Sequence, residues 1–186
     1  MKVRYLKLGD TINLNNQIWQ ILKIEHTHRG RGKAEIELTL KNIINGTVNK
    51  KVFNPDEEVE EVELEKRPIK FLYSKKDVAY FTDGNNKYEI NSEILGEKFK
   101  FLKKDLDIKG LFYEDKLINV ELPIKAVYKV IETSPGVKGD SEKSNYKIAR
   151  IETGAEITVP LFIEIGEEIV VNLEKGEYVE RYKGSI

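Results

Sequence analysis

A short basic segment, residues 27–33, contains the side chains with the clearest potential for binding or chemistry. It places basic residues around two glycines, in the order His28, Arg29, Gly30, Arg31, Gly32 and Lys33. A guanidinium presents five donors to phosphate and ribose oxygens and stacks on bases, and glycine lets a backbone approach a partner closely. The segment suits contact with RNA, with Arg31 at its centre. The alternative interpretation is an ordinary solvated basic hairpin.

The other reactive residue types indicate no enzyme class. His26 and His28 project to one face of an extended strand, but no third ligand is evident beside them, so we expect no metal site. The acidic runs at 56–61 and 164–168 supply the carboxylates that a glycosidase requires, although such runs usually cover a solvated face. The sequence holds no nucleophile elbow, phosphate-binding loop or zinc-protease motif. We therefore expect neither catalysis nor a cofactor.

Composition is typical of a folded, highly charged chain, and the absence of cysteine fits a reducing compartment. Of 186 residues, 40% are hydrophobic and 34% charged, which is typical of globular domains. There is no cysteine, which excludes disulfides and Cys-ligated zinc. The opening residues have no apolar signal region and no apolar run is long enough for a membrane span. We expect a cytoplasmic protein without membrane contact.

Charge is distributed unevenly although the net charge is only −1. Residues 1–54 hold ten Lys or Arg against four Asp or Glu, whereas residues 127–186 hold eight against eleven. A cationic front and an anionic rear would orient a molecule in the field of an RNA particle. The alternative is that a chain rich in Lys and Glu carries such surfaces without any consequence.

The dominant period is two, which predicts an all-β fold. Residues 17–25 and 34–41 alternate apolar and polar side chains on either side of the basic segment, which predicts a long hairpin with an exposed basic tip. Asn45-Gly46 predicts a two-residue turn. Five short strands in this region predict an SH3-like barrel that ends near Lys66.

Two prolines suggest the remaining boundaries. Pro68 is expected to interrupt the ladder and begin a second barrel over residues 67–126, and Pro123 lies near the start of a third over residues 127–186. In the second barrel, Ser92 is expected to cap one short helix. Strands, a short helix and further strands are compatible with an OB-type barrel. The predicted domains are therefore 1–66, 67–126 and 127–186.

A long stretch of the last third is similar to a known family signature. Residues 147–166, KIARIETGAEITVPLFIEIG, join a Lys-x-Ala, a glycine, a Val-Pro and a final glycine at the spacing of bacterial translation elongation factor P. Residues 134–140 and 176–179 resemble the flanks of that signature, and residues 40–47, 62–67 and 71–73 resemble earlier family segments in order. The resemblance covers essentially the whole chain. It implies a KOW/SH3-like barrel followed by two OB-like barrels.

The resemblance also implies a function. Members of the family bind the ribosome between the peptidyl and exit tRNA sites and relieve stalling at consecutive prolines, and a basic loop of the first barrel reaches the acceptor end of peptidyl-tRNA. By register Arg31 is the tip residue, with Arg29 in place of the family proline. Since arginine lacks the amine that is lysylated in some members, Arg31 is either rhamnosylated by a glycosyltransferase or unmodified. The alternative function is a general RNA- or protein-binding scaffold without ribosomal action.

A second loop corresponds to a family contact in the third barrel. Gly139, Asp140 and Ser141 resemble the loop that lies near the messenger RNA codon in the exit site, although Asp140 is equally suited to form a turn. Near the C-terminus the chain departs from the family, because Asn172 and Glu174 stand where Asp and Arg are usual. We expect a monomer.

Overall fold

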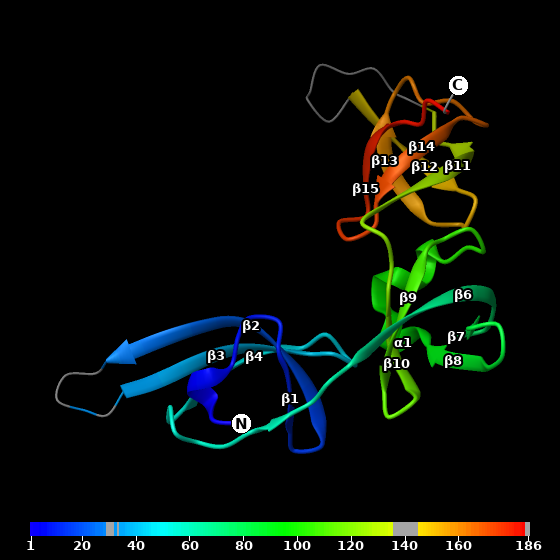
Figure 1. Ribbon diagram of the computed structural model, residues 1–186. Coiled ribbons are helices and arrows are strands. Elements are labelled where there is room, and N and C mark those ends of the chain that lie inside the picture. The colour runs from blue at the N-terminus through cyan, green and yellow to red at the C-terminus, as the bar shows by residue number, and fades with distance from the viewer. Residues whose placement is uncertain (29–31, 33, 136–144, 185–186) are drawn as a thin grey trace. The chain divides into compact units, whose positions relative to one another are not determined.

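The computed structural model describes residues 1–28, 32, 34–135 and 145–184. Within these residues the strands form three five-stranded sheets in tandem (Figure 1). Their strand orders are β4-β3-β2-β1-β5, β10-β9-β6-β7-β8 and β13-β12-β11-β14-β15. The prediction of an all-β chain with three tandem barrels is confirmed.

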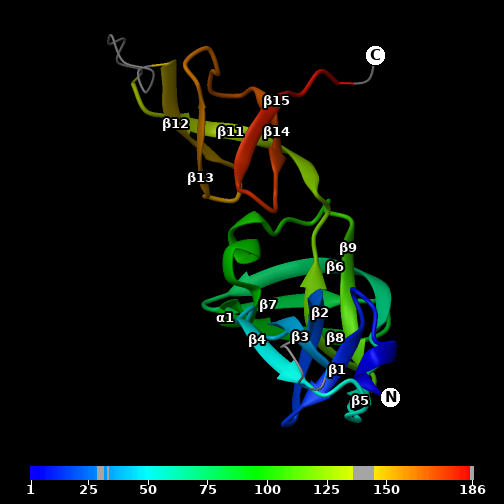
Figure 2. The same ribbon diagram turned by 90° about the vertical axis from the view of Figure 1, so that its left-hand side faces the viewer.

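The elements of the first barrel are η1 (Val3–Tyr5), β1 (Thr11–Leu14), β2 (Gln17–His28), β3 (Ala34–Asn42), β4 (Val48–Phe53) and β5 (Glu60–Glu61). Those of the second are β6 (Glu65–Lys75), β7 (Val78–Thr82), β8 (Lys87–Asn91), α1 (Ser92–Leu95), η2 (Gly96–Phe101), β9 (Ile108–Tyr113) and β10 (Lys116–Glu121). The third barrel comprises β11 (Lys125–Thr133), β12 (Tyr146–Ile151), β13 (Glu156–Pro160), β14 (Glu168–Asn172) and β15 (Glu177–Arg181). Figure 2 shows β11 between β12 and β14.

The chain divides into two compact units that are interleaved in sequence. One unit comprises Met1–Arg67 and Gly110–Val120, and the other comprises Pro68–Lys109 and Glu121–Ile186. The second barrel therefore contributes residues to both units. The predicted boundaries at 66/67 and 126/127 stay predictions.

Alternating side chains of the first barrel build a closed apolar core. Phe53, at 2% exposure, is among its largest buried side chains, and Trp19 packs against the cluster from its edge. The buried members come from η1 and the residue after it, from β1 to β4 and from the segment before β5: Val3, Leu6, Ile12, Ile21, Ile36, Leu38, Leu40, Phe53 and Val59. Burial of this area removes apolar surface from water and stabilises the barrel that carries the basic segment.

Polar contacts join residues 110–120 to the rest of their unit, one from the first barrel and the others from Arg67 of β6. The buried amide of Asn119 donates to the Ile43 carbonyl at 2.6 Å. The Arg67 guanidinium lies 4.4 Å from the centre of the Phe112 ring and donates to the Asp115 carboxylate at 2.5 Å. These contacts hold the segment Gly110–Val120 against Met1–Arg67, the other part of the first unit.

Two local expectations about the second barrel are wrong. Pro68 does not interrupt the ladder, because β6 runs continuously through it; pairing of β6 with β7 starts only at Lys70, so β7 does not require the missing N–H of Pro68. The helix cap is Asn91 rather than Ser92, since the Asn91 side chain accepts from the Glu93 N–H at 3.0 Å. α1 then gives way to the 3₁₀-helix η2 at Gly96, whose φ is +55°.

Tyr128 links η2 to β11 within the second unit. Its fully buried hydroxyl donates to the Phe101 carbonyl at 2.7 Å, and the two rings lie 6.0 Å apart. The Lys103 ammonium lies 4.5 Å from the centre of the Tyr128 ring and pairs with Glu152 at 3.2 Å. Burial, with Glu152 adding to it, raises the pKa of Tyr128 above its ordinary value, so the phenol keeps its proton and remains a donor.

Substituting Tyr128→Phe is expected to lower the free energy of unfolding by about 1–3 kcal/mol, because it leaves the Phe101 carbonyl without this donor. Urea denaturation followed by far-UV circular dichroism measures the change. Tyr146→Phe is the matched control, since Tyr146 is 56% exposed. Equal unfolding midpoints for Tyr128→Phe and the wild type would contradict the assignment.

Candidate RNA-binding hairpin

The basic segment lies between the paired ends of two long strands, β2 and β3, and together these form what we call the basic hairpin (residues 17–42; Figure 1). Their register runs from Trp19 opposite Asn42 to His28 opposite Ala34, with one irregularity between Ile21 and Lys23. The alternating apolar and polar residues that predicted these strands, 17–25 and 34–41, lie within β2 and β3. The predicted long hairpin is confirmed up to the His28–Ala34 pair.

The end of the hairpin extends beyond the third strand of its sheet. β4 pairs with β3 only as far as Phe53 opposite Ile36. Beyond that point Thr27, Glu35 and the strand ends pair only with each other. Beyond Ile36, therefore, the outer edge of β3 has no paired strand among the described residues.

Two cations on or beside the hairpin arms, Lys23 of β2 and Lys50 of β4, are paired with carboxylates. The Lys23 ammonium donates to Glu25 at 2.7 Å, and the Lys50 ammonium of β4 donates to Glu37 at 2.8 Å. The hydrogen bond from Lys23 holds the pKa of Glu25 below its ordinary value, and that to Glu37 raises the pKa of Lys50. These arms carry little surplus charge, so attraction of a polyanion depends on the basic segment itself.

The structure describes only part of the predicted site. His28 closes β2, and Gly32 is exposed. The others, Arg29, Gly30, Arg31 and Lys33, lie outside the described residues, as do Gly139, Asp140 and Ser141. Their roles stay predictions.

A shallow depression beside the last paired residues of β2 and β3 contains a cation that the sequence did not indicate. It has a volume of about 560 Å³ and is lined by Arg4, His26, Ala34, Ile36, Asn54, Pro55 and Asp56. Arg4 pairs with Asp56, and Lys2 reaches the same carboxylate at 3.2 Å. No local motif marks Arg4, since the fold brings residue 4 beside residues 26 and 56.

In the third barrel, the residues on either side of the predicted messenger RNA loop are held by hydrogen bonds. Ser134 Oγ accepts from the Ile148 N–H at 3.2 Å, and the Ser134 N–H donates to the Ile148 carbonyl at 2.9 Å. On the other side, the Asn145 carbonyl accepts from the Leu161 N–H at 3.1 Å. These bonds attach both ends of the segment 136–144 to the third sheet.

Asn172, one of the two departures from the family pattern, caps a turn. Its side-chain oxygen accepts from the backbone N–H groups of Glu174 and Lys175, both at 3.0 Å. An aspartate performs the same capping through a carboxylate oxygen. Asn172 is therefore as well suited to this turn as the aspartate that the resemblance implies, while Glu174 is an anion where the resemblance implies a cation.

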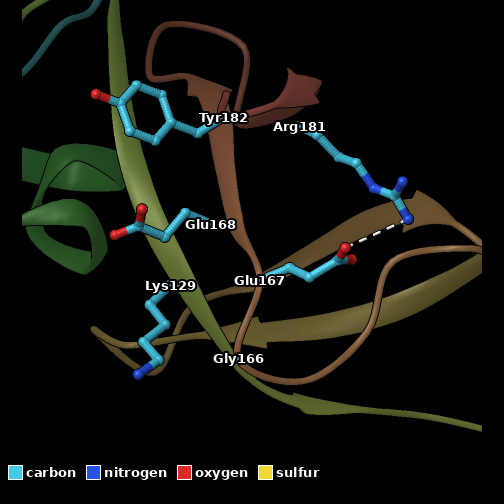
Figure 3. A pocket seen from close by; sticks show the side chains of 6 residues that line it. All are labelled: Lys129, Gly166, Glu167, Glu168, Arg181 and Tyr182. Atoms are coloured by element: carbon cyan, nitrogen blue, oxygen red, sulfur yellow. Dashed lines mark ion pairs between the residues drawn. The ribbon is translucent and has the colours of Figure 1, made fainter. Parts of the chain in front are cut away.

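A second depression, in the third barrel, shows how the acidic run is arranged (Figure 3). It has a volume of about 320 Å³ and is lined by Lys129, Gly166, Glu167, Glu168, Arg181 and Tyr182. Glu167 turns towards Arg181, with 3.3 Å between the carboxylate and the guanidinium, whereas Glu168 points away from both. The two carboxylates therefore do not face each other across this depression.

No three His, Asp or Glu side chains among residues 1–28, 32, 34–135 and 145–184 cluster as metal ligands do. None of the helices in the same ranges has the length and hydropathy needed to cross a bilayer.

Sequence comparisons define the chain as a translation factor built from tandem β-barrels. Three family descriptions match it in order: the elongation factor P KOW-like domain at residues 2–59, the elongation factor P OB domain at 64–120 and the elongation factor P C-terminal domain at 127–181. The chain belongs to the elongation factor P family. The predicted order of a KOW/SH3-like barrel and OB-type barrels is confirmed.

Named relatives agree over nearly the full length. Elongation factor P of Dictyoglomus thermophilum is 40% identical over 175 residues, which are 93% of this chain and 95% of the relative. Elongation factor P of Gloeobacter violaceus is 37% identical over 178 residues, or 94% and 95% of the two chains. A solved structure of translation initiation factor 5A from Methanococcus jannaschii superposes on 66% of this chain and 92% of its own, with 16% identity and a TM-score of 0.47.

Proposed function

We propose that this protein binds the ribosome between the peptidyl and exit tRNA sites and stimulates peptide-bond formation where consecutive prolines stall it. The observation that carries the proposal is the basic hairpin: two long strands are paired up to His28 and Ala34, and the sequence between these two residues contains Arg29, Arg31 and Lys33. Membership of the family supports the same role. The protein then acts in the cytoplasm, as a monomer.

The proposed mechanism is positional. Arg31 contacts phosphate, ribose or base at the acceptor end of peptidyl-tRNA, and His28, Arg29 and Lys33 add phosphate contacts that weaken as salt rises. Gly30 and Gly32 allow close approach of the backbone. Holding the peptidyl-tRNA in a reactive geometry lowers the entropic cost of peptidyl transfer. The ribosome performs the chemistry, and the protein itself is not an enzyme and needs no cofactor.

One further contact and one modification complete the proposal. The loop with Gly139, Asp140 and Ser141 lies beside the messenger RNA codon in the exit site, where Asp140 and Ser141 can bond base edges. Arg31 is a candidate for rhamnosylation by a glycosyltransferase of the host. Intact-mass measurement of protein from its native host decides this point, because a sugar mass mapped to Arg31 distinguishes the modified from the unmodified form.

Reconstituted translation tests the proposed function. With a message that encodes three consecutive prolines, added protein is expected to restore full-length product, and with a message that lacks proline runs it is expected to change nothing. The measurement is the rate of full-length synthesis at increasing protein concentration. An unchanged stall at saturating protein would overturn the proposal and favour a scaffold that binds RNA or protein without ribosomal stimulation.

A further inference from the structure

The outer face of the second barrel carries two stacked tyrosines and a lysine, which we call the tyrosine face (Tyr73, Tyr80 and Lys87). Tyr73 of β6 lies opposite Tyr80 of β7, with ring centres 4.8 Å apart and ring planes 27° from parallel. The Lys87 ammonium of β8 lies 4.8 Å from the centre of the Tyr73 ring and 4.6 Å from that of Tyr80. It also donates to the Tyr73 hydroxyl at 2.5 Å.

A bulge in β6 turns Tyr73 outward. Phe71 pairs with Phe81, which is fully buried, and the register shifts between Phe71 and Tyr73. Without this shift, residues two apart on a strand would share the core face. Tyr73 instead pairs with Tyr80 and remains 46% exposed although its ring stacks on a neighbour. The irregularity thus places aromatic surface in water, where it has no packing role in the core.

Cations outnumber carboxylates on this face. The cross-strand register puts Lys70, Lys75 and Lys87 on the same side as the two tyrosines, with Glu89 opposite Tyr80. Within the described part of the chain, Lys70 and Lys75 form no ion pair. The hydrogen bond to Tyr73 raises the pKa of Lys87, which stays cationic. The charge of the face is complementary to a polyanion.

We propose that the tyrosine face stacks an unpaired base of single-stranded RNA, while Lys70 and Lys75 contact the flanking phosphates. Aromatic side chains beside lysines are the combination that single-strand binders use, because every base has a stackable face and every nucleotide a phosphate. The position fits as well: β7 and β8 are the second and third strands of this OB-type barrel, and OB barrels bind oligonucleotides on that face.

The inference goes beyond the proposed function, which relies on loops of the first and third barrels. It concerns binding by the protein alone, so it is tested without ribosomes. A failure of the stall assay leaves this site unaffected, and a failure here leaves the stall assay unaffected.

The test titrates the full chain, labelled with ¹³C in its tyrosine rings, with a five-adenosine RNA and follows the rings by NMR. The ring signals of Tyr73 and Tyr80 are expected to shift together. Tyr73→Ala is expected to weaken binding about 5- to 100-fold, the range measured for loss of one base–aromatic stack. Tyr73→Phe keeps the ring and is expected to bind within a few-fold of the wild type. Tyr182→Ala is the matched control, since Tyr182 has a similar exposure of 40% in the third barrel.

Inorganic polyphosphate, which has charge but no bases, distinguishes stacking from simple charge attraction. The proposal requires RNA to shift the two rings much more than polyphosphate does. Equal shifts from both polyanions would reduce the site to a cationic patch and overturn base stacking. The site itself would be overturned if Tyr73→Ala bound RNA with unchanged affinity. It would also be overturned if the NMR signals of both rings did not shift at RNA concentrations up to millimolar.

Discussion

Replacing Arg31 with alanine is expected to remove most of the relief of polyproline stalling while leaving the fold intact. In the proposed complex the guanidinium makes charge-assisted bonds to the tRNA end, and each such bond contributes about 1.5–3 kcal/mol. If that energy is realised in the reactive geometry, its loss slows peptide-bond formation by roughly 10- to 100-fold at saturating protein. The measurement is the rate of synthesis through three consecutive prolines, with protein in excess over ribosomes.

Two variants separate the role of Arg31 from a general effect of charge. Lys41→Ala removes one exposed cation from β3, at the opposite end of the basic hairpin, and is expected to retain nearly full stimulation. Arg31→Lys keeps the charge but lacks the planar donor fork, so an intermediate rate is expected. Equal losses for Arg31→Ala and Lys41→Ala would show that only overall charge matters. Full activity of Arg31→Ala would contradict the assigned role.

Much of the fold could be predicted from the sequence because strand periodicity is a local signal. The alternation on either side of the basic segment gave both arms of the basic hairpin, and the structure pairs them to His28 and Ala34. Tandem short strands with turn residues between them predicted three small barrels. Local patterns suffice where each strand buries one face, as β3 does with its alternating burial.

Features that depend on distant partners could not be predicted in this way. Pro68 looked like a boundary, but whether its missing N–H matters depends on where β7 begins to pair. The tyrosine face needs the bulge after Phe71, which no composition rule reveals. Likewise Arg4 enters the depression beside His26 only because η1 folds back on the first barrel. Each of these features depends on tertiary contacts, and no local sequence pattern marks the residues that form it.

The first barrel must stay folded for the basic hairpin to be presented, and Phe53 is the residue on which this depends most directly. It ends β4 opposite Ile36, where the third strand of the sheet stops and the two-stranded extension begins. Its ring is 2% exposed and belongs to the apolar cluster. A cavity at this position removes packing beneath the point where the two-stranded extension begins.

Phe53→Ala is therefore expected to lower the free energy of unfolding of the first barrel by about 3–5 kcal/mol, through lost burial and the cavity that remains. Trp19 is the single tryptophan of the chain and packs against this cluster, so its fluorescence during urea denaturation reports on the first barrel specifically. Val52→Ala, one residue earlier on β4 and 48% exposed, is the matched control and is expected to change the free energy of unfolding by less than about 1 kcal/mol. Similar midpoints for the two variants would mean that Phe53 is not part of a packed core. Presentation of the basic hairpin would depend on the integrity of this barrel if two results are found together. Phe53→Ala would lower the free energy of unfolding by the expected amount, and its relief of stalling would fall over the same temperature range as the Trp19 fluorescence signal.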